Sequence, residues 1–576
     1  MKKIYYSILT LSITLLIVYA CQNPLENIII PISPKLSTYE VSIKVSDVSN
    51  PASLSEEGAL EVELLGPDAD KILNNAGEST FSAKNGIINL AVNKKYSDIV
   101  DPLRFTVKVS GENYLTTTIP VVIDGTSELM QLYANVVNIE TPPVGVKVEK
   151  EVATIVGDGS VTEEIVVSTS SDENAEDVEG PSTEISIHTG TVFKNAEGEV
   201  LHGNELEVQV INFDSNEPSS LESFPGGFSP NSVIDQSGEE VTTGNFVTAG
   251  FASIDMFVDG EEVTEFSEPI EVVMKINDDT YNPETNEPIK VGDIVPIWSY
   301  SNDDGQWVFH GDGVVTPAVD GSLEVKYTTT HLSSYNLDFF TNNRRCSSGN
   351  VVVEIEDAHR LPSGNSYELK AYLVSPNSSQ PLGNGRAIIN ITKDTKEITL
   401  NNSIDMDMQL LIVRDRVLTY SGRDDWHSPA LPDADSVVFY EYINHWSHTY
   451  RWTQHIYRSE VFNGCDNNIS ISLYDHLSKL DASVEVYVEY AGYCDNRKIA
   501  PSVNLYRKKA DGEFGFVGYV DKGVITMSVP KLDSTYLFGF YWGDTFYEDS
   551  LHIDSDRMVN TNLNLDEFCD KILENL

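Results

Sequence analysis

Tyr39-Glu40-Val41-Ser42-Ile43-Lys44-Val45 alternates apolar and polar side chains, which is the period of a strand with one buried face. The same period recurs in Leu60–Leu64 and in Phe105–Val109. Turn residues separate these runs, as at Asn85-Gly86 and Asp124-Gly125. Together these features predict an immunoglobulin-like β-sandwich over residues 36–140.

The remainder of the 576-residue chain is long enough for several more domains of ordinary size. Residues 141–182 are predicted to be a linker with short strands, because Ser168–Gly180 is dominated by Ser, Asp, Glu and Asn. Three further units are predicted, namely a central β domain at 183–341 and β-sandwiches at 346–460 and 461–576. The predicted fold class is all-β, with several immunoglobulin-like or β-sandwich domains in series after a lipoprotein signal peptide.

The N-terminus carries the pattern of an exported lipoprotein. Lys2 and Lys3 precede a short apolar run, and Val18-Tyr19-Ala20-Cys21 resembles the lipobox of a bacterial lipoprotein. We therefore predict a signal peptide at 1–20, acylation of Cys21 and a lipid-anchored tether at 21–35. The predicted location is the outer membrane, on its periplasmic or cell-surface face, and the predicted partner of the anchor is the membrane itself.

Charge restricts the other partners. The chain has 38 basic and 89 acidic residues, for a net charge of −51. This charge repels nucleic acid and argues against a nucleic-acid partner. It suits a soluble ectodomain, and a glycan or protein ligand remains open.

Four cysteines follow Cys21, and an even number in an exported protein predicts disulfides. We favour Cys346 with Cys465 and Cys494 with Cys569. A bridge between Cys465 and Cys494 is the alternative, because Ile469–Leu473 and Val484–Val488 form a candidate hairpin between them. None of the cysteine spacings is that of a structural zinc site.

The most specific sequence signal lies in the central domain. Gly226-Gly227 predicts a turn with positive φ, and Trp298 and Trp307 are predicted core aromatics on either side of a turn at Asp303-Asp304-Gly305. The ordered segments are Phe224–Phe228, Ala249–Asp255, Gly292–Tyr300, Gln306–Phe309 and Thr330–Asp338. This series resembles a β domain of cartilage intermediate layer protein and of uncharacterised Bacteroidota surface lipoproteins. The resemblance implies an extracellular, non-catalytic β-sandwich module.

Within that series, His331-Leu332-Ser333 also resembles the cleavage tripeptide of self-cleaving GAIN and ZU5-type β domains. The resemblance implies that His331 acts as base, that Leu332 supplies the carbonyl and that Ser333 is the nucleophile, with backbone strain driving the acyl shift. In the self-cleaving domains of receptors, cysteine and tryptophan precede the tripeptide. In this chain Tyr327 and Thr328–Thr330 stand there instead. We favour a structural role for the histidine, which would brace neighbouring strands.

Two further stretches are candidate binding sites. Tyr440–Trp452 has aromatic residues at strand spacing, so a hairpin could present Trp446, Tyr450 and Trp452 to a glycan, or these residues could pack as a small core. His445, His448 and His455 are weak metal-ligand candidates. The acidic residues of 278–287 lack the order of a calcium loop, which favours a solvated loop. No metal site is predicted.

The chain contains no serine-hydrolase elbow, zinc-protease motif, phosphate loop or dinucleotide fingerprint. We therefore predict a protein that is not an enzyme and uses no cofactor. The favoured function is a membrane-anchored extracytoplasmic lipoprotein that acts as a non-catalytic, adhesion-like binding or scaffold protein. The alternatives are an accessory glycan-binding lipoprotein of a nutrient uptake system and a β domain that cleaves itself at Leu332-Ser333.

Overall fold

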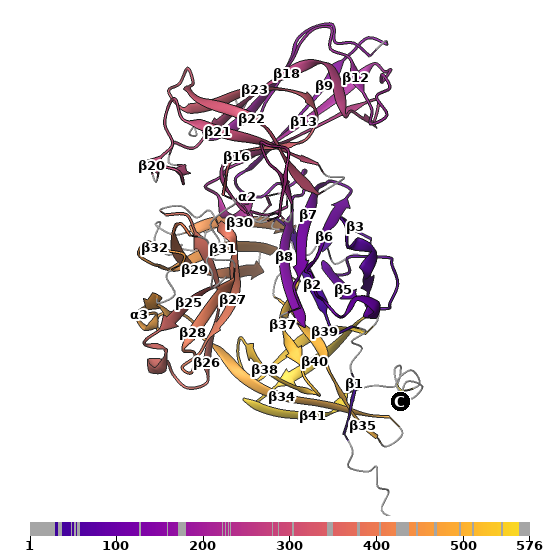
Figure 1. Cartoon of the computed structure of the whole chain (residues 1–576). Coiled ribbons are helices and arrows are strands. Elements are labelled where there is room, and N and C mark those ends of the chain that lie inside the picture. The colour runs from indigo at the N-terminus through magenta and orange to yellow at the C-terminus, as the bar shows by residue number, and fades with distance from the viewer. Residues whose placement is uncertain are drawn as a thin grey trace, which may run out of the picture.

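The structure is a computed structural model of the whole chain, and it is nearly all β (Figure 1). This confirms the predicted all-β fold class with several β-sandwich-like domains, whereas the predicted signal peptide lies outside the described residues. The described residues are 29–563 and 569, except for gaps at 33–36, 48, 51–52, 55–57, 126–127, 158, 171–179, 222, 225, 229, 231, 243, 279, 286, 302–304, 342–349, 377–380, 402–404, 422–436, 445–446, 466–468, 495–496, 510–511 and 543–544. No helix among these residues is long and apolar enough to cross a membrane.

The first unit is a two-sheet sandwich, as the alternating runs predict. One sheet has the order β4-β5-β2-β8 and the other β3-β6-β7, and their apolar faces enclose one core. At the Asn85-Gly86 turn both φ angles are positive, and a Cβ on Gly86 would clash with the carbonyl oxygen of Val45. The elements are β2 (Glu40–Asp47), β3 (Glu61–Leu65), η2 (Ala69–Lys71), β4 (Ile72–Asn74), β5 (Ile87–Val92), η3 (Lys94–Tyr96), β6 (Leu103–Gly111), β7 (Tyr114–Ile123) and β8 (Leu129–Val136).

The central unit is built on a long curled sheet with the order β10-β11-β18-β23-β22-β21-β24-β16-β13-β9. The two end strands, β9 and β10, contact each other, so the sheet curls back on itself. Its elements are β9 (Val146–Thr154), β10 (Ile165–Ser168), β11 (Ser182–Ile187), β12 (Phe193–Lys194), β13 (Glu205–Phe213), α2 (Pro218–Leu221), β14 (Val233–Ile234), β15 (Glu240–Val241), β16 (Asn245–Val258), β17 (Glu261–Glu262), β18 (Glu265–Ile276), β19 (Tyr281–Asn282), β20 (Glu287–Pro288), β21 (Ile294–Ser301), β22 (Gln306–Pro317), β23 (Leu323–His331) and β24 (Ser334–Thr341).

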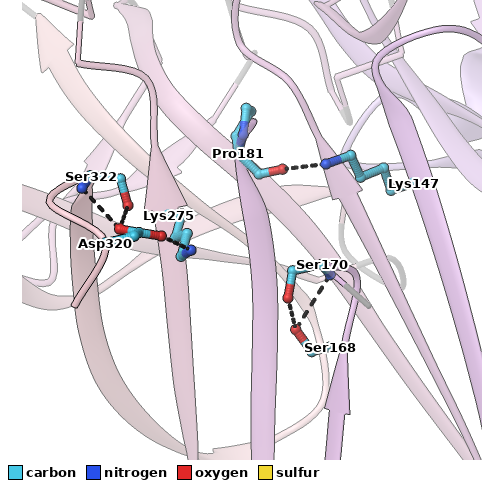
Figure 2. A network of polar contacts seen from close by, with 7 residues as sticks. All are labelled: Lys147, Ser168, Ser170, Pro181, Lys275, Asp320 and Ser322. Atoms are coloured by element: carbon cyan, nitrogen blue, oxygen red, sulfur yellow. Dashed lines mark hydrogen bonds and ion pairs between the residues drawn. The ribbon is translucent and has the colours of Figure 1, made fainter. Parts of the chain in front are cut away.

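Strands β9 and β10 lie in the stretch predicted to be a linker, and they are the edge strands of the central sheet. β9 pairs along its full length with β13, and β10 pairs with β11. Lys147 on β9 also donates to the carbonyl of Pro181 at 3.3 Å (Figure 2). Ser168 ends β10, and residues 171–179, which make up most of the polar stretch that suggested a linker, lie outside the described residues.

Ionic contacts also hold the ends of the central strands. Lys275 on β18 forms an ion pair with Asp320, which lies in the turn between β22 and β23 (Figure 2). Asp320 also accepts hydrogen bonds from the backbone and the hydroxyl of Ser322. The bond from Lys275, followed by those from Ser322, lowers the pKa of Asp320 below its ordinary value.

An aromatic cluster fills the end of the central unit that meets the first sandwich. Trp307 is fully buried, and its ring contacts Phe224, Phe246 and Tyr300. Trp298 is also buried, and its nearest rings are those of Phe246, Phe309 and Phe340. The two tryptophans are therefore core residues, as predicted, and they are joined through Phe246.

The third unit packs beside the central one, and a single apolar core runs through both. It contains a small sheet, β28-β25-β33, and a larger one in which β27, β26, β29, β31 and β30 lie side by side. Its elements are β25 (Asn350–Ile355), η4 (Ala358–Arg360), β26 (Asn365–Val374), β27 (Pro381–Ile391), β28 (Glu397–Asn401), β29 (Asp407–Ser421), β30 (Val437–Asn444), β31 (Ser447–Arg458), β32 (Phe462–Asn463), β33 (Ile469–Ile471) and α3 (Tyr474–Leu477).

The third unit extends beyond residue 460, its predicted end. β32 pairs with β29, and β33 pairs with β25. The candidate hairpin of Ile469–Leu473 with Val484–Val488 is wrong. Ile471 is instead buried beside Val353 and Ile355. The prediction failed because alternation of apolar and polar residues marks a strand but does not reveal which strand it pairs with.

The fourth unit has one sheet of the order β37-β36-β39-β40 and a second centred on β34. β34 pairs with β35, β38 and β41, and its first residues also pair with β26 of the third unit. The elements are β34 (Ser483–Cys494), β35 (Arg497–Pro501), β36 (Val503–Lys508), β37 (Phe514–Val520), β38 (Val524–Val529), β39 (Ser534–Trp542), β40 (Thr545–Ile553), β41 (Arg557–Leu563) and, from the N-terminal end of the chain, β1 (Ile29–Ile32).

The first and fourth units are joined directly, although they lie at opposite ends of the chain. Ser42 and Tyr506 share a buried hydrogen bond of 2.7 Å between their hydroxyls. Lys44 forms an ion pair of 3.2 Å with Glu513, and both side chains are more than nine-tenths buried. Tyr541 donates to the carbonyl of Lys84 at 2.6 Å. A buried ion pair at this seam favours one docking arrangement, because separating the partners leaves each charge unpaired.

The first unit also contacts the central unit. The hydroxyl of Thr118 on β7 bonds to that of Tyr300 on β21, and the backbone N–H of Gly226 donates to the carbonyl of Thr118 at 3.2 Å. The first sandwich therefore bridges the central and fourth units, while the third unit bridges them on the other side (Figure 1). The four units close into one body.

Candidate functional site

The tripeptide His331-Leu332-Ser333 lies at the tight connection between β23 and β24. The N–H of Leu332 donates to the carbonyl of Thr264 at 2.9 Å, and the carbonyl of Ser333 accepts from the N–H of Ile254 at 3.3 Å. None of the three residues has a positive φ. The connection is therefore held on both sides by backbone hydrogen bonds.

The hydroxyl of Ser333 completes the sheet between β21 and β24. It accepts from the N–H of Tyr300 at 2.8 Å and donates to the carbonyl of Tyr300 at 2.7 Å or to that of Ser334 at 2.9 Å. Its hydrogen-bonding capacity is thus used by backbone groups. This arrangement favours an architectural role for the hydroxyl.

The imidazole of His331 faces a different group of residues. Its Nδ1 lies 3.5 Å from the hydroxyl of Thr329, and its ring packs near the rings of Tyr335 and His310. Burial, and then the nearby His310, lower the pKa of His331. Among the described contacts, none joins this imidazole to the Ser333 hydroxyl. The three residues are consecutive in the chain, but the imidazole of His331 and the hydroxyl of Ser333 are not aligned as base and nucleophile.

We expect the wild-type chain to remain in one piece and Ser333→Ala to do the same, with a destabilised central unit. Losing the hydroxyl leaves the backbone groups of Tyr300 without their partner, which should cost about 1–3 kcal/mol. Denaturing electrophoresis with intact mass measurement tests the first expectation, and thermal melting tests the second. Thr330→Ala, at an exposed position on β23, is the matched control. A fragment that begins at Ser333 in protease-inhibited wild type would show that the chain cleaves itself.

The aromatic stretch forms a hairpin, as predicted. β30 and β31 pair in antiparallel register from Val437↔Gln454 to Asn444↔Ser447. Phe439 pairs with Trp452 and Glu441 with Tyr450, so these positions share one face of the ribbon. His445 and Trp446 lie outside the described residues, as do the side chains of Tyr450 and Trp452.

The acidic loop forms the short β19–β20 hairpin. Asn282 is buried and accepts a hydrogen bond from the N–H of Glu284 at 2.9 Å, while Glu287 pairs with Lys290. Asp279 and Asn286 lie outside the described residues. Within the described part of the chain, no three His, Cys, Asp or Glu side chains gather as metal ligands. His455 lies on β31, where burial, followed by Arg458, lowers its pKa.

One predicted disulfide is confirmed. Cys494 at the end of β34 is bonded to Cys569, and their Cα atoms are 5.3 Å apart. The alternative bridge between Cys465 and Cys494 is therefore wrong. Cys465 is also disulfide-bonded, and Cys346 lies outside the described residues, so the pairing of these two stays a prediction. Cys21 also lies outside that part.

Sequence reasoning missed a buried polar pair in the aromatic cluster. Asn336 and Asp338 on β24 are fully buried, and the amide of Asn336 donates to Asp338 Oδ2 at 2.7 Å. Burial raises the pKa of Asp338 well above its ordinary value, although a hydrogen bond from Thr248 opposes this. Burial therefore favours the protonated, neutral form of this carboxyl. The only signal in the sequence is two polar residues at strand spacing on a face that packs against Trp298.

Asp255 on β16 adds a pH dependence to the stability of the central unit. Burial raises its pKa from 3.8 to about 6, against a hydrogen bond of 3.3 Å from Gln209. The unfolded chain releases this proton at a lower pH than the folded chain does. The contribution of Asp255 to the free energy of unfolding is therefore complete below pH 3.8 and is lost as the pH rises through about 6.

We expect Asp255→Asn to stabilise the central unit at pH 7.5 by about 2 kcal/mol and to have little effect at pH 4, because asparagine needs no proton to stay neutral. Thermal melting at the two pH values measures this difference. Asp312→Asn, at an exposed position on β22, serves as the control. Equal shifts at both pH values would contradict the assignment.

Comparisons with known proteins identify no family for this chain. No protein-family model matches it, and no curated protein does so. A solved structure of a streptococcal ancillary pilin matches with 11% sequence identity and a TM-score of 0.11, over 48% of this chain and 94% of the pilin chain. The resemblance of residues 183–341 to cartilage intermediate layer protein and to Bacteroidota lipoproteins therefore stays a prediction.

Proposed function

We propose that this chain is an extracytoplasmic lipoprotein, anchored through Cys21, that acts as a non-catalytic binding or scaffold protein. The lipobox-like Val18–Cys21 supports the anchor, and the disulfide between Cys494 and Cys569 fits an oxidising compartment. The net charge of −51 fits an exposed soluble ectodomain.

The observation that carries the proposal is the closure of four β units into one body. Domains joined only by flexible linkers would move independently. Here the Lys44–Glu513 ion pair attaches the first unit to the fourth, and the Thr118–Tyr300 hydrogen bond attaches it to the central unit. A body of this kind holds a binding surface at a defined place relative to its anchor. That property is what a scaffold or adhesion-like protein requires, since an ordered arrangement reduces the entropy lost on binding.

Acylation of Cys21 is the direct test of the anchor. We expect mass spectrometry of the mature N-terminal peptide to show an acylated Cys21, and we expect Cys21→Ser to abolish membrane retention completely. Two or more acyl chains give near-permanent attachment, whereas none leaves a soluble protein. An unmodified Cys21 in membrane-extracted protein would refute this part of the proposal.

A glycan-binding role is the second candidate, and the hairpin register favours it. The positions of Phe439, Tyr450 and Trp452 share one face of the β30–β31 ribbon, which is the spacing of an aromatic platform for sugar rings. A glycan array on the soluble ectodomain tests it. Loss of a signal in Trp452→Ala, with retention in Tyr440→Ala on the opposite face, would support this role. An array with no signal above background would leave the scaffold function as the better account.

A further inference from the structure

The strand that follows the predicted anchor is attached to the last unit of the fold. β1 pairs in parallel with β35, from Ile29↔Lys498 to Ile32↔Pro501. Ile29 lies eight residues after Cys21, and eight residues span at most about 29 Å. The membrane attachment point therefore lies within that distance of the β34–β35 hairpin, even though the chain continues from β1 into the first sandwich.

The other end of the chain converges on the same hairpin. β41 pairs in parallel with β34, and Cys569 is bonded to Cys494, the last residue of β34. Cys494 in turn pairs with Arg497 at the start of β35. In Figure 1, β1, β34, β35 and β41 lie together at the bottom of the molecule, and the strands of the central unit lie at the opposite end.

Net negative charge is concentrated in the central unit, at the end of the molecule opposite the fourth unit (Figure 1). Residues 144–341, which form the central unit, contain 39 acidic and 6 basic residues, so this unit supplies −33 of the net charge of −51. Residues 483–563, which form most of the fourth unit, contain 12 acidic and 8 basic residues, for a net charge of −4. An anionic bilayer surface therefore repels the central unit strongly and the fourth unit weakly.

We propose that the fourth unit faces the lipid surface and that the acidic central unit points away from it. This orientation rests on the proposed function, because it needs the anchor at Cys21. The β1–β35 pairing holds the near-neutral end of the body at the bilayer, and repulsion from anionic headgroups acts in the same direction. The surface offered to a partner at the far end is then that of the central unit, and its charge favours a partner with a basic face.

The experiment uses the full acylated chain in vesicles of phosphatidylcholine and phosphatidylglycerol that contain an acceptor-labelled lipid. A donor dye is placed at Val559→Cys on β41 or at Val319→Cys in the turn between β22 and β23, since both positions are exposed. Unsubstituted protein measures background labelling. We expect energy transfer to the membrane to be at least twofold more efficient from position 559 than from position 319. Equal transfer, or stronger transfer from position 319, would overturn the orientation.

A matched pair of variants tests the role of β1. Replacing residues 29–32 by Gly-Ser-Gly-Ser removes the apolar strand and should reduce the difference between the two dyes. The same replacement at residues 22–25 keeps β1 and should preserve the difference. A mass spectrum of each preparation distinguishes a failure of the proposed anchor from a failure of the proposed orientation. Unmodified Cys21 counts against the anchor, whereas acylated Cys21 with equal transfer from both dyes counts against the orientation alone.

Discussion

Trp307→Ala is expected to destabilise the central unit by about 3–5 kcal/mol, the range for removing a fully buried large aromatic side chain. Trp307 is 0% exposed, and ring centroids of Tyr300, Phe224 and Phe246 lie 4.8, 5.3 and 5.7 Å from its own. The alanine variant loses these contacts and leaves a cavity, because the surrounding strands are held by their sheet pairing.

The effect should reach the first unit as well. Tyr300 packs on Trp307 and bonds to Thr118 of the first sandwich, so loosening one ring weakens the seam. Calorimetry and limited proteolysis of the ectodomain measure both consequences. Trp307→Phe, which keeps an aromatic ring, should show a smaller loss. An alanine variant that melts with the wild type would mean that the cluster does not support the central unit.

Cys494→Ala is expected to cost about 4 kcal/mol and to lower the melting temperature of the fourth unit. The bridge to Cys569 spans a sequence separation of 75 residues, and a closed loop of that length removes much of the entropy of the unfolded chain. The double variant Cys494→Ala, Cys569→Ala should lose no more than the single variant, because one alanine already removes the bridge.

The control for this result is the central unit, whose melting should not change. Nonreducing peptide mapping of the wild type should recover Cys494 joined to Cys569. A Cys494→Ala variant with unchanged melting would mean that strand pairing of β41 with β34 holds the C-terminal segment without the bridge. Such a result would also weaken the view that both chain ends are secured at the β34–β35 hairpin.

The candidate sites could be predicted from sequence only as short motifs. His331, Leu332 and Ser333 are adjacent in the chain, but the partners that decide their role come from other strands, above all Tyr300 on β21. Cys494 with Cys569 was predicted from the number of cysteines and their order, and the sequence left the competing bridge to Cys465 open. The buried pair of Asn336 and Asp338 was missed, because composition does not show which polar side chains lose their water.

The sequence by itself determined the all-β class, because alternation such as Tyr39–Val45 reports one buried face for each strand. It also determined local turns such as Asn85-Gly86, where a positive φ selects the residue type. Tertiary structure alone decided which strands are neighbours. β1 pairs with β35 across the whole length of the chain, β33 pairs with β25 rather than β34, and β9 joins the central sheet. The physical reason is that strand pairing uses backbone hydrogen bonds that every residue offers, so partners are chosen by the packing of the complete body.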